Sequence, residues 1–149
     1  MTTVIRPANE ADLPSLASLE SSLFSVPWSQ TALAGHLSAD HTLSLLLFEG
    51  DDPVGYLLAG FTPPEGELYR IAVLPDRRRR GYGRRLLDAF LEAAKAKGAS
   101  DLWLEVRESN AAAISLYRAA GFALSARRDR YYRDPTEAAL VMTATRPKE

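Results

Sequence analysis

The sequence predicts a single mixed α/β domain that spans residues 1–149. Segments with apolar residues at helical spacing alternate along the chain with β-rich runs, and turns rich in glycine and proline separate them. A chain of 149 residues is the size of one domain that can bury a substantial core by itself. Neither a repeat, a linker nor a low-complexity segment divides it.

Composition narrows the class of protein further. The chain has 46% hydrophobic and 25% charged residues, which is ordinary for a soluble globular protein. Its N-terminus lacks the pattern of a secretory signal and no apolar run approaches the ~20 residues of a membrane span, so we expect a cytoplasmic protein that has no membrane partner. Cysteine is absent, which excludes disulfides, thiolate metal sites and a cysteine nucleophile. The two histidines, His36 and His41, match no ligand spacing, so we expect no metal.

The first elements are predicted from caps and periodicity. A short strand over residues 4–6 precedes Asn9, a good N-cap residue for a helix that ends at about Leu23. Apolar residues at helical spacing support this helix, namely Leu13, Leu16, Leu19 and Leu23. Ser29 can cap a second helix that continues through Leu37.

A β-hairpin and a third strand follow. Residues 42–49 are rich in strand formers, residues 50–53 form a turn, and residues 54–61 are the second strand of the hairpin. The segment Pro63–Gly66 then turns the chain into the next strand, over residues 68–74.

The second half begins with a long helix from Gly83 to Lys97, which a glycine follows as a C-cap. Residues 102–106 are the next strand. A short helix over residues 111–120 comes after it, capped by Asn110 or by the serine before it.

Two strand-like runs, over residues 122–132 and 138–144, form the last part of the chain. They are joined at Asp134-Pro135, a pair of turn residues. The tail therefore predicts a pair of adjacent strands.

The segment between the third strand and the long helix indicates a phosphate site. Four consecutive arginines, Arg77–Arg80, are followed there by Gly81 and Gly83. Backbone N–H groups at a helix N-terminus have no partner within the helix and carry part of the positive helix dipole. The glycines let an anion approach the backbone, and the arginines add charge and forked donors. We therefore expect a polyphosphorylated ligand, although a solvated arginine run is the alternative and the loop matches neither a P-loop nor a dinucleotide fingerprint.

A second segment makes a resemblance specific. Asn110 is followed by Ala113, Tyr117 and then Gly121-Phe122, so that residues 110–122 match Asn-x-x-Ala-x-x-x-Tyr-x-x-x-Gly-Phe. Together with Arg78-Arg79-Arg80-Gly81-Tyr82-Gly83, this chain resembles the GNAT superfamily of N-acetyltransferases. The resemblance implies a central, mostly antiparallel sheet flanked by helices, with a C-terminal β-hairpin. It also implies that the arginine and glycine loop binds the pyrophosphate of acetyl-CoA and that the second motif lines the pantetheine arm.

Within the superfamily the chain is most similar to the bacterial ribosomal-protein-alanine N-acetyltransferase (RimI) group. The similarity includes Pro27-Trp28-Ser29, Ile71-Ala72-Val73 and Tyr131-Tyr132, whereas Arg70 stands where that group usually has asparagine. Glu108 and residues 135–137 also depart from the group, and these departures bear on the peptide preference. The implied function is acetyl transfer from acetyl-CoA to a protein α-amine, with the N-terminal alanine of a small-subunit ribosomal protein as the favoured acceptor.

The resemblance also assigns site residues. Glu105 is implied as the general base, Tyr117 as the general acid, and Trp28 and Tyr131 as contacts of the acceptor peptide. Acetyl-CoA is expected on Ile71, Ala72, Val73, Arg78, Arg79, Arg80, Gly81, Tyr82, Gly83, Arg84 and Asn110.

The chemistry requires such groups. A peptide α-amine with a pKa near ~8 is mostly protonated at pH 7, so a base must take its proton before it attacks a thioester. Glu105 can do this directly or through water, and Tyr117 can protonate the leaving thiolate. The resemblance further implies that a backbone N–H near Val73 meets the developing oxyanion, because the family splays the strand there and leaves donors unpaired. Without cysteine, direct transfer in a ternary complex is the simpler course.

Other interpretations stay open. Glu105 could be a surface carboxylate paired with Arg107 or Arg84, and Tyr117 a packed tyrosine. The acceptor could be another protein N-terminus, a lysine side chain or a small amine. A function of another class is a non-catalytic module that binds RNA or the ribosome through residues 77–85 and 127–133. The net charge of −1 disfavours this module, so we expect no direct contact with nucleic acid.

Overall fold

A seven-stranded sheet forms the centre of the computed structural model, which describes residues 2–146. The strand order is β1-β2-β3-β4-β5-β7-β6, and every neighbouring pair is antiparallel except β4 and β5, which are parallel. The strands are β1 (Thr3–Pro7), β2 (Thr42–Glu49), β3 (Asp52–Thr62), β4 (Glu65–Val73), β5 (Asp101–Arg107), β6 (Ala123–Tyr132) and β7 (Glu137–Thr145). The expected mixed, mostly antiparallel sheet and the C-terminal hairpin of β6 and β7 are confirmed.

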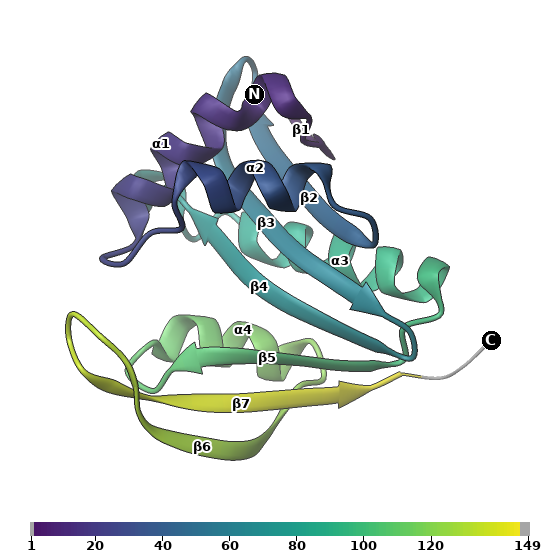
Figure 1. Cartoon of the computed structure of the whole chain (residues 1–149), viewed down its shortest axis with the longest axis vertical. Helices are drawn as coiled ribbons and strands as arrows, with labels where there is room; N and C mark the ends of the chain where they lie inside the picture. Colours follow the sequence, from purple (N-terminus) through teal and green to yellow (C-terminus); the bar gives the residue numbers. More distant parts are fainter. Residues whose placement is uncertain (1, 147–149) are drawn as a thin grey trace.

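Helices cover both faces of this sheet, as Figure 1 shows. The α-helices of the described residues are α1 (Leu13–Leu23), α2 (Gln30–Ser38), α3 (Tyr82–Lys97) and α4 (Ala111–Ala119). Helices α1 and α2 lie over one face of β2, β3 and β4, whereas α3 and α4 lie behind the sheet in that view. Side-chain alternation along the strands explains this arrangement. On β2, Leu46 packs with α1 and α2, while its neighbours Leu45 and Leu47 pack with α3.

The predicted caps explain where the helices begin and end. Ser29 accepts a hydrogen bond from the N–H of Ala32 at 3.0 Å and so caps α2. Asn9 caps as expected, but it caps a short 3₁₀-helix, η1 (Glu10–Asp12), from which α1 then continues. Gly98 ends α3 with a φ of +75°, a left-handed conformation that suits glycine. Most element boundaries lie within a few residues of those that the sequence predicts.

Strand β4 differs most from its predicted range. It begins at Glu65 and not at Leu68, so Gly66, which the sequence places in a turn, lies inside the strand. A Cβ atom on Gly66 would lie 2.9 Å from Cδ2 of Leu102, so a larger residue here would force the Leu102 side chain on β5 to shift, and the glycine suits this close packing. A glycine that serves packing and one that serves a turn look alike in sequence, which is why the strand is predicted too short.

The two parallel strands of the sheet part halfway along their length. Strands β4 and β5 are paired from Glu65 and Asp101 as far as Leu68 and Leu104, and no further pairing between them is present in the described residues. Immediately after Leu68 the register of β4 against β3 shifts, with Tyr69 as the extra residue of a β-bulge. Such a bulge bends its strand, so β4 follows β3 away from β5. We refer to this parting of β4 and β5 as the fork.

Candidate active site

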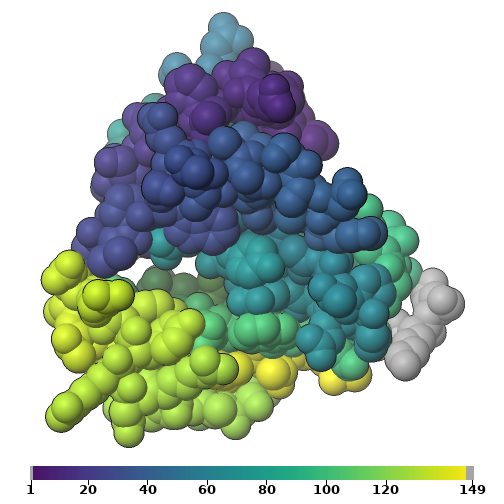
Figure 2. All heavy atoms as spheres, viewed as in Figure 1, coloured from purple at the N-terminus to yellow at the C-terminus, as the bar shows by residue number. Residues whose placement is uncertain are grey.

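The fork leaves backbone groups of β4 without a strand partner. The N–H of Leu74 donates to the carbonyl of Val54 on β3 at 2.9 Å. Because antiparallel hydrogen bonds alternate along a strand, Ile71 and Val73 direct their backbone groups to the opposite edge, where β5 has already parted. The space-filling view shows the surface hollowed at this level, between the part coloured blue to teal and the yellow-green part (Figure 2). The predicted residues Ile71 and Val73 therefore lie at the unpaired edge of β4, and Ala72 between them pairs with Tyr56 of β3.

The loop before α3 has the features of an anion site. Arg79 and Gly81 have φ values of +65° and +79°, so the backbone turns sharply twice just before the helix. The first backbone hydrogen bond of the helix runs from the N–H of Arg85 to the carbonyl of Gly81, and no side chain caps this end. The N–H groups of residues 82–84 thus lie in the unpaired first turn of a 16-residue helix. A Cβ on Gly81 would meet no atom within 4 Å, so the space beside the loop is open.

A buried carboxylate fixes this loop to the sheet. Glu49, at the end of β2, is 3% exposed and accepts hydrogen bonds from Arg77 Nε at 2.7 Å, from Arg80 at 2.8 Å and from the hydroxyl of Tyr82. The hydrogen bond from Tyr82 and then those from the arginines lower the pKa of Glu49 to about 2. The side chains of Arg80 and Tyr82 are therefore tied to Glu49, and both residues also lie where their backbone N–H groups are available to a phosphate.

The remaining arginines of the loop have different partners. Arg78 donates from Nε to the carbonyl of Val73 at 3.2 Å, which joins the loop to the fork edge of β4. Arg84 pairs with Asp88 one helical turn along α3, at 2.9 Å. The hypothesis of a wholly solvated arginine run is wrong for Arg77 and Arg80, because both are tied to Glu49.

Glu105 lies on β5 just beyond the last pair of the fork, with its side chain 13% exposed. Its Oε1 accepts a hydrogen bond from the hydroxyl of Tyr131 at 3.1 Å, so two predicted site residues meet there. Its Oε2 lies 3.3 Å from Arg128 Nε, yet it is buried and has no hydrogen-bond partner in the described residues. The alternative pairing of Glu105 with Arg107 or Arg84 is wrong, since Arg107 binds Glu137 and Arg84 binds Asp88.

A second carboxylate, that of Glu67, lies close enough to Glu105 to interact with it, although the sequence does not single it out. Glu67 on β4 is half-buried, and burial followed by the charge of Glu105 raises its pKa to about 7. The positive charge of Arg128 acts in the opposite direction. Two glutamates thus share one arginine at the base of the fork.

Tyr117 lies on α4 and is almost fully buried, with its ring edge-on to Phe122 at a centroid distance of 6.1 Å. Burial, and then the nearby Tyr132, raise the pKa of Tyr117. Its hydroxyl makes no hydrogen bond to any residue between 2 and 146. The pKa of Tyr132 is raised to about 12, first by burial and then by the charge of Glu105. Tyr132 is therefore close enough to the predicted base and to the predicted acid to interact with both, although the sequence indicates it only as part of a motif.

Asn110 has a structural task that the sequence also anticipated. Its side-chain oxygen accepts from the N–H of Ala113 at 3.2 Å and so caps α4. This hydrogen bond positions the short helix that carries Tyr117.

Trp28 lies in the connection between α1 and α2, in a cluster of rings. Its ring lies 5.6 Å from His36 and 5.9 Å from Tyr69 of β4, measured between centroids. Its backbone N–H donates to Oε2 of Glu20 at 2.8 Å, and Glu20 is fully buried. Trp28 comes from the α1–α2 connection and Tyr131 from the end of β6. Figure 1 shows the α1–α2 connection and the β6–β7 connection, which follows Tyr131 and Tyr132, facing each other.

Glu20 is a residue that sequence reasoning missed. It accepts hydrogen bonds from the hydroxyl of Tyr56 and from Arg70, whose Nε lies 3.2 Å away. Arg70 also donates to the carbonyl of Val26 at 3.0 Å and stacks 3.8 Å from the ring centroid of Phe24. Arg70, named above as a departure from the ribosomal-protein-alanine group, therefore links the α1–α2 connection to β4. A charged residue four positions after Leu16, on an apolar helix face, is the signal that could have indicated Glu20.

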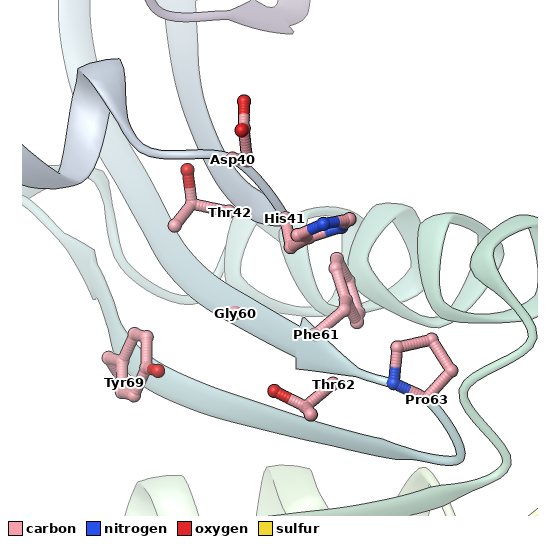
Figure 3. A pocket seen from close by; sticks show the side chains of 8 residues that line it. All are labelled: Asp40, His41, Thr42, Gly60, Phe61, Thr62, Pro63 and Tyr69. Carbon is pink, nitrogen blue, oxygen red and sulfur yellow. The ribbon is translucent and has the colours of Figure 1, made fainter.

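A further pocket of about 320 Å³ opens elsewhere, between the start of β2 and the end of β3 (Figure 3). Its lining residues are Asp40, His41, Thr42, Gly60, Phe61, Thr62, Pro63 and Tyr69. None of the residues predicted for the site lines it.

Within residues 2–146 there is no group of three or more acidic, histidine or cysteine side chains that could hold a metal ion. No helix of that part of the chain is long and apolar enough to cross a membrane.

Comparisons with known proteins agree with this geometry. The model of the acetyltransferase (GNAT) family matches residues 13–122. A curated relative, the [ribosomal protein bS18]-alanine N-acetyltransferase of Salmonella typhimurium, is 38% identical over 121 residues, which is 81% of each chain. The crystal structure of the ribosomal-protein-S18-alanine N-acetyltransferase from Escherichia coli superposes with a TM-score of 0.91 at 32% identity, covering 99% of this chain and 96% of that one. The NatC complex bound to Gag peptide and CoA superposes with a TM-score of 0.89 over 99% of this chain and 100% of that one, and at 22% identity this shows the fold alone.

The anchoring of the loop leads to a testable prediction about pH. A carboxyl group whose pKa is lower in the folded than in the unfolded protein stabilises the fold at pH values above its pKa in the unfolded protein. This stabilisation is lost as the pH falls to the pKa in the folded protein. We expect Glu49→Gln to lower the melting temperature clearly at pH 7. The difference from wild type should shrink between about pH 4.3, the usual value for a glutamate, and about pH 2. Glu92→Gln, which changes an exposed residue of α3, is the control in the same thermal scans. A deficit that stays constant down to pH 2 would contradict this role of Glu49.

Proposed function

The chain belongs to the GNAT family of acetyltransferases, and from this premise we propose that it acetylates the N-terminal alanine of ribosomal protein bS18. Membership makes it an acetyl-CoA-dependent N-acetyltransferase. The acceptor is proposed because relatives at 35–38% identity over most of the chain carry that name. The observation that carries the proposal within the molecule is the hydrogen bond between Tyr131 and Glu105 beside the fork. We place the reaction in the cytoplasm, where ribosomal proteins are made.

The described residues fit the cofactor. A polyphosphate suits the open loop before α3, where the N–H groups of residues 82–84 are unpaired and Arg79 carries positive charge. The backbone groups of Ile71 at the fork edge of β4 would pair with an amide group of the pantetheine arm, as a neighbouring strand would. Acetyl-CoA supplies the acetyl thioester when bound. The N–H of Val73 would meet the negative charge that develops on the thioester oxygen.

The remaining residues would move protons and hold the acceptor. Glu105, with one oxygen held by Tyr131 and the other free of hydrogen bonds, would take a proton from the acceptor ammonium. Tyr117 would give a proton to the departing thiolate, because a tyrosine is protonated at neutral pH and its hydroxyl is not engaged by another described residue. Trp28 and Tyr131 would contact the first residues of the acceptor peptide from the two sides of the fork.

The acceptor is tested with a panel of short peptides. We expect acetyl transfer to a peptide with the N-terminal sequence of bS18 from the same organism, measured by mass spectrometry and by release of free thiol. The matched controls are the same peptide with its α-amine blocked and an internal lysine left free, and the same peptide with a different first residue. Equal transfer to the blocked peptide would show that the acceptor is a lysine side chain.

The phosphate site is tested at Gly81. Asparagine and aspartate both tolerate a positive φ better than most residues and have nearly the same shape. We expect Gly81→Asp to bind CoA at least about tenfold more weakly than Gly81→Asn at low salt, because a carboxylate repels the pyrophosphate. The ratio should fall at physiological salt, where the screening length is about 8 Å. Calorimetry measures both affinities.

The control for this pair lies at the other end of the same helix. Gly98 has a φ of +75° and equally open surroundings, so Gly98→Asp and Gly98→Asn should bind CoA alike. If the two variants at Gly81 also bind alike, the pyrophosphate does not lie at this loop.

The proton transfers are tested at Glu105 and Tyr117. Glu105→Gln keeps size and hydrogen bonding but removes basicity, and Tyr117→Phe removes only the hydroxyl. We expect each change to lower kcat by about 10²–10⁴-fold and to leave the affinity for acetyl-CoA nearly unchanged. The Glu105→Gln defect should shrink at high pH, where the amine, with a pKa near ~8, is already neutral. Wild-type rates of both variants between pH 6 and 9 would show that these residues are structural.

A further inference from the structure

Glu67 and Glu105 occupy neighbouring positions at the base of the fork. Glu67 pairs in register with Trp103, which lies two residues before Glu105 on β5. Because every second residue of a strand faces the same side, Glu67 and Glu105 point to the same face of the sheet, one diagonal step apart. They flank Leu68 and Leu104, the last pair before the strands part.

These two carboxylates have too little positive charge around them. Among residues 2–146, no group donates a hydrogen bond to Glu67 and no cation forms an ion pair with it. Arg128 lies 3.3 Å from Glu105, and its positive charge lowers the pKa of Glu67. The other groups around Glu67 are the hydroxyls of Tyr69 on β4 and Tyr131 on β6. Two half-buried carboxylates beside one arginine tend to hold one proton between them.

We propose that Glu67 is a further positioning residue for acetyl transfer, which shares a proton with Glu105 and so receives the proton that leaves the acceptor. This inference rests on the proposed function, in which Glu105 is the base. An N–H bond of the acceptor ammonium breaks, its electron pair stays on nitrogen, and the proton passes to Glu105. The proton moves on to Glu67, directly or through a water molecule, and then leaves to solvent. Before the transfer, the excess negative charge of the pair attracts the ammonium group to this position.

The first experiment tests the pair without any acetyl transfer. In protein labelled with ¹³C at the glutamate carboxyl groups, Glu67 should titrate near pH 7 in the wild type. Because the charge of Glu105 contributes to this value, the midpoint should fall in Glu105→Gln toward the usual value of about 4.3. Glu65→Gln is the matched control, since it removes an exposed carboxylate two residues away on the same strand. A midpoint that Glu105→Gln does not move would overturn the pair, whatever the acceptor of the enzyme is.

The second experiment tests whether the pair serves the reaction. With saturating acetyl-CoA and an N-terminal alanine peptide, kcat is measured from pH 6 to 9.5 for wild type, Glu67→Gln and Glu65→Gln. Glu67 can receive a proton only above about pH 7, and the amine needs to lose one only below its pKa near ~8. We therefore expect the ratio of wild type to Glu67→Gln to peak at about tenfold between pH 7 and 8 and to approach one at both ends. Glu65→Gln should follow the wild type throughout.

Two results of this experiment would overturn the role of Glu67. A ratio near one at every pH would make Glu67 a spectator, and a constant deficit at every pH would make it a structural residue. If the wild-type enzyme acetylates a different amine, the acceptor proposed above is wrong, and the same profile measured with that amine decides the role of Glu67.

Discussion

The parting of β4 and β5 is the constraint on which the rest of this structure depends. Each strand keeps one partner to its end, since β4 pairs with β3 up to Val73 and β5 pairs with β7 up to Arg107. Beyond Leu68 and Leu104, however, the two strands leave their facing edges unpaired. An unpaired edge inside a protein requires a partner for its N–H and C=O groups. The fork therefore leaves an open edge that suits an extended ligand with amide groups.

The arginine loop shows how internal charge pairing shapes a binding site. Glu49 holds Arg77, Arg80 and Tyr82, so part of the charge that makes the sequence conspicuous is already paired within the protein. The loop is thereby fixed with Arg79 and Gly81 in left-handed conformations and with the first turn of α3 facing outward. Rigid N–H groups at a helix end bind an anion without a further cost of ordering the loop. Arginine side chains then add attraction at longer range, where salt screens it.

The two sides of the fork are held by separate polar networks. On one side, buried Glu20 joins Tyr56, Arg70 and the backbone of Trp28, which fixes the α1–α2 connection against β4. On the other side, Arg107 donates to the carbonyls of Arg133 and Pro135, which fixes the β6–β7 connection near Tyr131. Arg70 and residues 135–137 are the positions where the sequence interpretation places departures from the ribosomal-protein-alanine group, so these networks are where we expect the acceptor preference to be set.

The sequence by itself determined the order and type of the elements, the caps at Ser29 and Asn110, and the position of the loop before α3. These features depend on contacts between residues close in the chain, which local periodicity and capping chemistry reveal. Only the tertiary structure decided that Gly66 lies in a strand, that Arg80 is bound to Glu49 and that Glu105 pairs with Arg128 and not with Arg107. It also decided that Glu67 lies near Glu105. This proximity depends on the register of β4 and β5, whose first residues, Glu65 and Asp101, are 36 residues apart in the sequence. Register between distant strands is set by packing across the whole sheet, and no local pattern encodes it.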